Sequence, residues 1–246
     1  MKSISPKILG DGLKSCNEIG KSLVKKKGVD CFLDVGAGEG QLTLEFAETI
    51  KTKHIYGIDF VDSNIILLKE KSINAVKVDL NGHFPFDDSS FDIILSSQNI
   101  EHICNVRSYL GECYRCLKKG GQFIVLTENL AAWDNIFSLI LGWQPFSTTP
   151  IDGWNVGNPL TWHLDEEKTL LKSDNIETYK NTGVVGVAGH VRVPTISSLK
   201  ELLQKTGFID IEIYTKGYFP FWGTLSEWLC SIDKRHGHFL IASCFK

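Results

Sequence analysis

The chain has 246 residues, of which 43% are hydrophobic and 22% charged, and its formal net charge at pH 7 is −3. This composition is typical of a globular protein and argues against a membrane-spanning chain, because no run reaches the ~18 apolar residues that a transmembrane helix needs. The lack of a long basic run also argues against a nucleic-acid partner bound through its phosphates.

Seven cysteines occur in a chain without an N-terminal apolar signal segment. An odd cysteine count in this context predicts reduced thiols and a cytoplasmic location. Cys113 and Cys116 lie inside a helical pattern and have no second pair, so we expect buried thiols there and not a zinc site.

Residues 1–30 carry apolar side chains at roughly helical spacing, which predicts one or two helices. The apolar run 31–35 predicts a first strand, and Gly36, Gly38 and Gly40 follow it before another helical pattern begins. Three glycines in five residues let a ligand lie against bare backbone at a helix N-terminus, where unpaired N–H groups favour a carboxylate or phosphate. A tight connection without a ligand is the alternative.

Two further predicted strands also end in acids. Residues 54–60 contain Asp59, 19 residues after the last glycine of the turn, and residues 76–79 end at Asp79. An acid at the tip of the second strand is placed to accept hydrogen bonds from both hydroxyls of a ribose, although it could instead cap the helix that follows. Together with Asp34, three successive strands end in an acid.

The predicted fourth strand, 91–97, leads into a polar run that ends in Glu101 and His102. Because open α/β sheets expose their reactive crevice at the carboxyl ends of the strands, we expect catalytic groups to begin here. A helical pattern over 105–117 ends in two lysines and two glycines, and residues 122–127 predict the fifth strand.

The character of the sequence changes after residue 130, because all six tryptophans and five of the seven prolines lie between Trp133 and Trp228. We interpret residues 131–194 as a helical and loop insertion above the sheet and as a candidate substrate lid. A packed aromatic cluster that only closes the domain is the alternative.

Thr195 is the predicted cap of a helix that ends at Gly207, and residues 208–214 and 238–245 predict the last two strands. The aromatic connection between these strands, residues 217–229, is a candidate surface for a membrane or a partner. Burial of the same segment inside the domain is the alternative. No oligomeric state follows from the sequence.

Five motifs within residues 31–129 together resemble a class I S-adenosylmethionine-dependent methyltransferase, and they are LDVGAGEG, GIDF, VKVDL, FPFDDSSFDIILSSQNIEH and LKKGGQFIVLTEN. The resemblance implies a Rossmann-like, doubly wound, seven-stranded and mostly parallel α/β sheet with an antiparallel last strand. It implies one domain over 1–246, with N-terminal helices at 1–30, a cofactor-binding half at 31–130, the lid, and a C-terminal helix and strands at 195–246.

The resemblance also implies S-adenosylmethionine as the cofactor. The glycines would admit its methionine part, Asp34 its amino group, Asp59 its ribose, and Asp79 with Leu80 its adenine. The implied cofactor residues are Asp34, Gly36, Ala37, Gly38, Gly40, Asp59, Phe60, Asp79, Leu80, Ser96 and Gln98.

A sulfonium methyl carries a good leaving group, so transfer needs alignment more than acid–base machinery. An oxygen acceptor would still benefit from a base, and His102, His163 and His190 are the candidates. We expect no metal site, because a metal-binding branch of this class has a further acid two positions before Glu101, where this chain has Asn99.

Segments such as GHVRVPTISSLKELLQKTGF also resemble methyltransferases of bacterial and archaeal surface-glycan and lipid gene sets. This second resemblance implies a small-molecule, glycan or lipid-linked acceptor. Two alternatives remain: an NAD-dependent oxidoreductase, although its usual GxGxxG differs from the GxGxG here, and a cofactor-binding partner protein without turnover.

Overall fold

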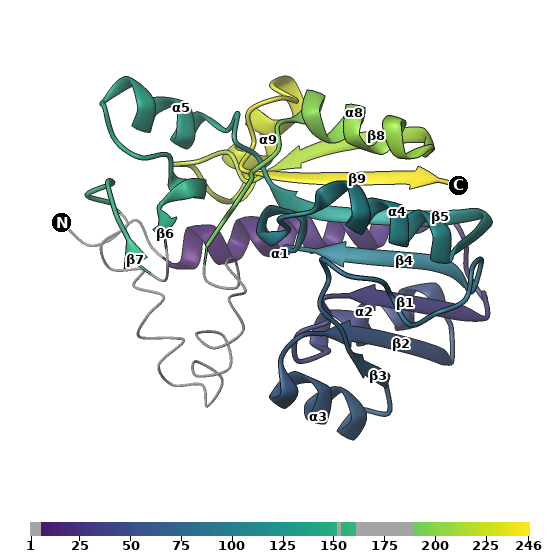
Figure 1. The fold of residues 1–246 in the computed structure, drawn as a ribbon. Coiled ribbons are helices and arrows are strands. Elements are labelled where there is room, and N and C mark those ends of the chain that lie inside the picture. The colour runs from purple at the N-terminus through teal and green to yellow at the C-terminus, as the bar shows by residue number, and fades with distance from the viewer. Residues whose placement is uncertain (1–5, 152–153, 161–188) are drawn as a thin grey trace.

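The computed structural model describes residues 6–151, 154–160 and 189–246. Its main element is a seven-stranded sheet with the order β3-β2-β1-β4-β5-β9-β8 (Figure 1). The strands are β1 Cys31–Val35, β2 His54–Asp59, β3 Asn74–Lys77, β4 Phe91–Ser97, β5 Leu117–Glu128, β8 Ile209–Lys216 and β9 Phe239–Phe245. Strands β1 to β5 are parallel, whereas β9 is antiparallel to both β5 and β8. The predicted sheet, with its antiparallel last strand, is confirmed.

Helices cover both faces of this sheet. They are α1 Pro6–Ser22, α2 Gln41–Ile50, α3 Asp62–Glu70, α4 Val106–Cys116, α8 Ile196–Thr206 and α9 Gly223–Ile232. Residues of α1 and α2 share a buried cluster with Ile93 and Ile124, whereas residues of α4 and α8 share another with Ile94 and Phe123. Adjacent residues of β4 and β5 thus face opposite layers, as the two-residue period of a strand requires. Figure 1 shows α1 behind the strands and α4 in front of them.

An insertion follows β5. It contains α5 Trp133–Ile140, the short 3₁₀ helix η2 Phe146–Thr148 and a small hairpin of β6 Pro150–Ile151 and β7 Trp154–Asn155. The predicted helical and loop insertion is therefore confirmed where the structure describes it, but His163 lies outside the described residues. Across the described ranges, no helix combines the length and the apolar character needed to cross a membrane.

Some boundaries differ from the predicted ones. Strand β3 ends at Lys77, two residues early, so Asp79 lies in the loop beyond the strand and is exposed. The last link to β2 is the bond from the Val78 N–H to the Asp59 carbonyl. Part of the aromatic connection after β8 is helical, because α9 begins at Gly223.

Candidate active site

The glycine turn connects β1 to α2 at the carboxyl edge of the parallel strands. Gly36, Gly38 and Gly40 have φ angles of 74°, 53° and 84°. A residue with a side chain adopts such positive φ angles only at a cost in free energy. A Cβ at Gly36 would lie 2.0 Å from Asn99 Oδ1, and one at Gly40 would lie 2.7 Å from Leu68. A Cβ at Gly38 would meet nothing within 4 Å, so this part of the turn leaves room for a ligand against the backbone.

Asp59 fixes the shape of this turn. Its Oδ2 accepts a bond from the Gly38 N–H at 2.8 Å, and its Oδ1 accepts bonds from the Val61 N–H and the Asn64 amide. The adjacent Ala37 is buried, and its N–H donates to the Ile58 carbonyl. Because a carboxylate oxygen has two lone pairs, Oδ2 retains one acceptor position for a further donor.

Asp34 lies on β1 and is only 2% exposed. Its Oδ2 accepts the Thr43 hydroxyl at 2.7 Å, but its Oδ1 is buried without a hydrogen-bond partner. Burial raises the pKa of this carboxyl to about 7. A positively charged ligand group would give Oδ1 a partner and favour the ionised carboxylate.

Two predicted cofactor residues, Ser96 on β4 and Gln98 just after it, have side chains in different surroundings. The Ser96 hydroxyl is 2.6 Å from the Tyr109 hydroxyl inside the core, so its side chain is already engaged away from solvent. Gln98 has a φ of 53°, and its backbone N–H donates to the Leu126 carbonyl. The Gln98 Nε2 is buried without a partner, so it is a second polar atom at this edge that a ligand could satisfy.

The remaining predicted cofactor residues lie toward β2 and β3. Asp79 is exposed, and its Oδ1 accepts bonds from the N–H and the amide of Asn81. Leu80 is half-buried against the core. Phe60 is also half-buried, with Lys77 Nζ 5.6 Å from its ring centroid. These side chains can border a flat ring at the end of the sheet.

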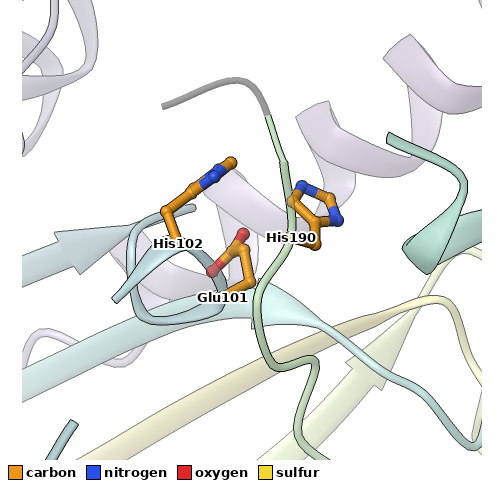
Figure 2. Close-up of side chains that lie close together, drawn as sticks. All are labelled: Glu101, His102 and His190. Carbon is orange, nitrogen blue, oxygen red and sulfur yellow. The ribbon is translucent and has the colours of Figure 1, made fainter. Parts of the chain in front are cut away.

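A second polar cluster lies beside the ends of β4 and β5, and Figure 2 shows its members Glu101, His102 and His190. One possible ligand atom from each of the three lies within 4.8 Å of the others. Glu101 and His102 belong to the 3₁₀ helix η1 Ile100–His102. The segment carrying His190 is held there because the N–H groups of Val191 and Arg192 both donate to the Glu101 carbonyl. The structure thus brings two of the three predicted bases together.

Glu101 is completely buried. Its Oε2 accepts the Thr127 hydroxyl at 2.7 Å, but its Oε1 has no hydrogen-bond partner. Burial, reinforced by the negative charge of Glu128, raises the pKa of Glu101 to about 7. The carboxyl is therefore balanced between its neutral and charged forms near neutral pH.

A buried ion-pair chain adjoins this cluster. Glu128 Oε2 lies 3.5 Å from His190 Nδ1, and Glu128 Oε1 lies 3.8 Å from His238 Nε2. His238 Nδ1 in turn lies 2.7 Å from Asp134 Oδ2. Desolvation opposes a charge on His238, but Asp134 and Glu128 outweigh it and hold the pKa of His238 well above its usual value. This imidazolium in turn lowers the pKa of Glu128 to about 2, against the effect of burial.

Residues 33–125 match the family model described as a methyltransferase domain. These 93 of the 246 residues are therefore similar to a methyltransferase domain. The match covers the five motifs except for the last four residues of the fifth, and the predicted resemblance to class I S-adenosylmethionine-dependent methyltransferases is confirmed.

Several named proteins are similar to this chain in sequence. A probable S-adenosylmethionine-dependent methyltransferase of Mycolicibacterium smegmatis is 25% identical over 161 residues, which are 64% of this chain and 56% of the relative. A ubiquinone biosynthesis O-methyltransferase of Bradyrhizobium is 28% identical over 60% of this chain and 61% of its own length. A demethylmenaquinone methyltransferase of Staphylococcus epidermidis is 30% identical over 44% of this chain and 48% of its own length. The chain thus spans about half to three fifths of the length of these relatives.

Two solved structures share the fold of nearly the whole chain. An S-adenosylmethionine-dependent methyltransferase from Mesorhizobium loti matches with a TM-score of 0.60 and 20% identity, over 97% of this chain and all of that one. A possible histamine N-methyltransferase from Thermotoga maritima matches with a TM-score of 0.59 and 17% identity, over 97% and 91%.

The structure also shows residues beside the site that sequence reasoning missed. Asn99 closes the turn, because its amide donates to the carbonyls of Val35 and Ser97. The Asp134 and His238 pair joins residues 104 positions apart, and no local pattern connects them. His236, two residues before His238, instead bonds Asp233.

Proposed function

We propose that this protein is an S-adenosylmethionine-dependent methyltransferase that binds its cofactor at the glycine turn and its acceptor beside Glu101, His102 and His190. The observation that carries the proposal is the buried and unpaired Oδ1 of Asp34 next to a turn with open space at Gly38. A cofactor with a cationic amino group and a carboxylate suits this pair of features, because the amino group can meet Asp34 and the carboxylate can meet backbone N–H groups.

Several of the predicted cofactor residues have a role in this proposal. Asp34 holds the amino group, and the turn holds the carboxylate. Asp59 accepts a ribose hydroxyl at its remaining Oδ2 position, and Asp79 with Leu80 borders the adenine. When bound, the cofactor supplies a sulfonium methyl group with a good leaving group. The protein's task is then to align an acceptor atom with that methyl group and to exclude water.

For the acceptor we propose a hydroxyl group on a small molecule, glycan or lipid-linked compound. A hydroxyl must lose its proton during transfer, and two histidines and a carboxyl with a pKa near 7 lie at the expected place. The relative from Bradyrhizobium is named as an O-methyltransferase of ubiquinone biosynthesis, which supports a ring hydroxyl as one form of this acceptor. We further propose that the described parts of the insertion, residues 131–151 and 189–194, border this side of the site, since η2 and the segment around His190 touch each other through the Ser147 carbonyl.

Exposed apolar side chains support a peripheral contact with a membrane that carries such an acceptor. Ile140 of α5 is 71% exposed, and Trp222 and Trp228, next to and within α9, are 61% and 57% exposed. Tryptophan suits the boundary between lipid and water because its ring is apolar and its N–H is polar.

The test is calorimetric titration of the purified full chain with S-adenosylmethionine, S-adenosylhomocysteine and NAD. We expect both adenosyl-sulfur compounds to bind and NAD not to bind. Asp59→Asn should weaken their binding at least tenfold, because it removes an acceptor and the charge. The matched control Asp62→Asn changes an exposed acid that pairs with Lys77 and should leave affinity unchanged. Binding of NAD alone, or equal losses in both variants, would contradict the proposal.

A further inference from the structure

We propose that Glu101, His102 and His190 form a binding site for a divalent transition-metal ion such as Zn²⁺. The role that we give the ion, which is to bind the acceptor hydroxyl and lower its pKa, depends on the proposed function. The binding of the ion does not. This proposal departs from the expectation of no metal site, because the third ligand, His190, comes from a distant segment of the chain.

The donor set suits such an ion. Two imidazoles and one carboxylate bind catalytic zinc in other enzymes and leave a fourth position open for a water or a substrate oxygen. In the structure one ligand atom from each side chain lies within 4.8 Å of the others. Bonds of about 2.0–2.2 Å in tetrahedral geometry place ligand atoms roughly 3.5 Å apart, so an ion would draw the three groups together by about 1 Å.

The surroundings orient both histidines for metal binding. His102 Nδ1 lies 3.1 Å from the Gly189 carbonyl, and His190 Nδ1 lies 2.7 Å from the Ser147 carbonyl. A carbonyl can only accept, so in the neutral rings each Nδ1 carries the proton and the lone pair is on Nε2. Histidine ligands of metal sites almost always show this arrangement.

Glu101 completes the pattern. The Thr127 hydroxyl holds one carboxylate oxygen, which leaves Oε1 buried without a hydrogen-bond partner in a side chain that is completely buried. An unsatisfied buried carboxylate oxygen is costly. A cation coordinated by Oε1 would remove that cost.

The charges facing the cluster also favour a dication. The carboxyls of Glu101, Glu128 and Asp134 are opposed by the imidazolium of His238. With all three carboxyls ionised, these three groups and the His238 imidazolium together have an excess of two negative charges. One divalent ion balances this excess, and it would favour the ionised form of Glu101.

The test uses the full chain without a histidine tag, stripped with a chelator and titrated calorimetrically with ZnCl₂ alone. We expect one ion per chain with a Kd of about 1 μM or lower. Glu101→Gln and His190→Gln should each weaken binding at least a hundredfold. The control His236→Gln changes a half-buried histidine outside the cluster and should leave binding unchanged.

A second measurement needs no variant, so it holds even if a substitution in the cluster prevents folding. Co²⁺ added to the stripped wild-type chain should give a visible absorption band, and Zn²⁺ should abolish it. No band together with Zn²⁺ affinity equal in wild type and His190→Gln would overturn the proposal. S-adenosylhomocysteine is titrated in parallel into the stripped protein. Its binding without metal binding refutes the metal site alone, whereas metal binding without nucleoside binding refutes the proposed function.

Discussion

Gly38→Ala separates the role of the glycine turn in binding from its role in folding. Gly38 has a φ of 53°, and a Cβ built there meets nothing within 4 Å. The folded protein should therefore lose only the cost of placing alanine in the left-handed region, about 1–2 kcal/mol. A bound cofactor that lies against the backbone would meet the new methyl group directly.

The expected effect on binding follows from packing. Forcing an extra methyl group into a filled contact costs about 1–3 kcal/mol, which corresponds to a loss of affinity of roughly 5- to 150-fold. Calorimetric titration with S-adenosylhomocysteine measures this loss, and urea unfolding measures stability. Both are done on the same preparations.

Gly28→Ala is the matched control. Gly28 has a φ of 68°, a Cβ there also meets nothing within 4 Å, and the residue is exposed before β1. It should lose the same 1–2 kcal/mol of stability without any loss of affinity. Wild-type affinity in Gly38→Ala would refute the placement of the cofactor at the turn. An equal loss in Gly28→Ala would show that the effect passes through stability.

Three further outcomes are expected. The affinity for S-adenosylmethionine should rise by up to tenfold per pH unit as the pH approaches 7 and then level off, because below the pKa of Asp34, about 7, binding must displace the proton of this carboxyl. Asp34→Asn should flatten this profile in titrations from pH 5.5 to 8. A flat profile of the wild-type protein would contradict this expectation. Thr195→Ala removes the capping box of α8 and should cost about 1 kcal/mol in urea unfolding, whereas the exposed Thr224→Ala should cost less than about 0.5 kcal/mol. Trp222→Ser together with Trp228→Ser should lower cosedimentation of the protein with lipid vesicles. Absence of cosedimentation of the wild-type chain would contradict the proposed membrane contact.

The geometry of the glycine turn follows from the sequence because its groups are close neighbours along the chain. A buried strand, three glycines and a helix must form a turn, and parallel pairing of β2 with β1 places Asp59 beside that turn. Asp79 was harder, because a strand end is set by the last hydrogen bond of the ladder. That bond is made by Val78 and not by Asp79 itself.

The acceptor side could not be predicted in the same way. His190 reaches Glu101 only because a segment without regular structure donates two backbone bonds to the Glu101 carbonyl. His238 reaches Asp134 because β9 inserts between β5 and β8. Such contacts depend on the path of the chain in three dimensions, and no spacing of residues in the sequence predicts them.

Unpaired buried atoms distinguish these two sides from the rest of the molecule. Seven buried side-chain atoms in the described ranges lack a hydrogen-bond partner, and five of them belong to Asp34, Gln98, Glu101, Glu128 and Asp134. Each such atom costs roughly 1–3 kcal/mol, so their concentration at one edge of the sheet is not explained by stability. The first two adjoin the glycine turn, and the other three adjoin the histidines. The fold therefore leaves unsatisfied groups at two neighbouring places, as a site for two ligands that meet between them requires.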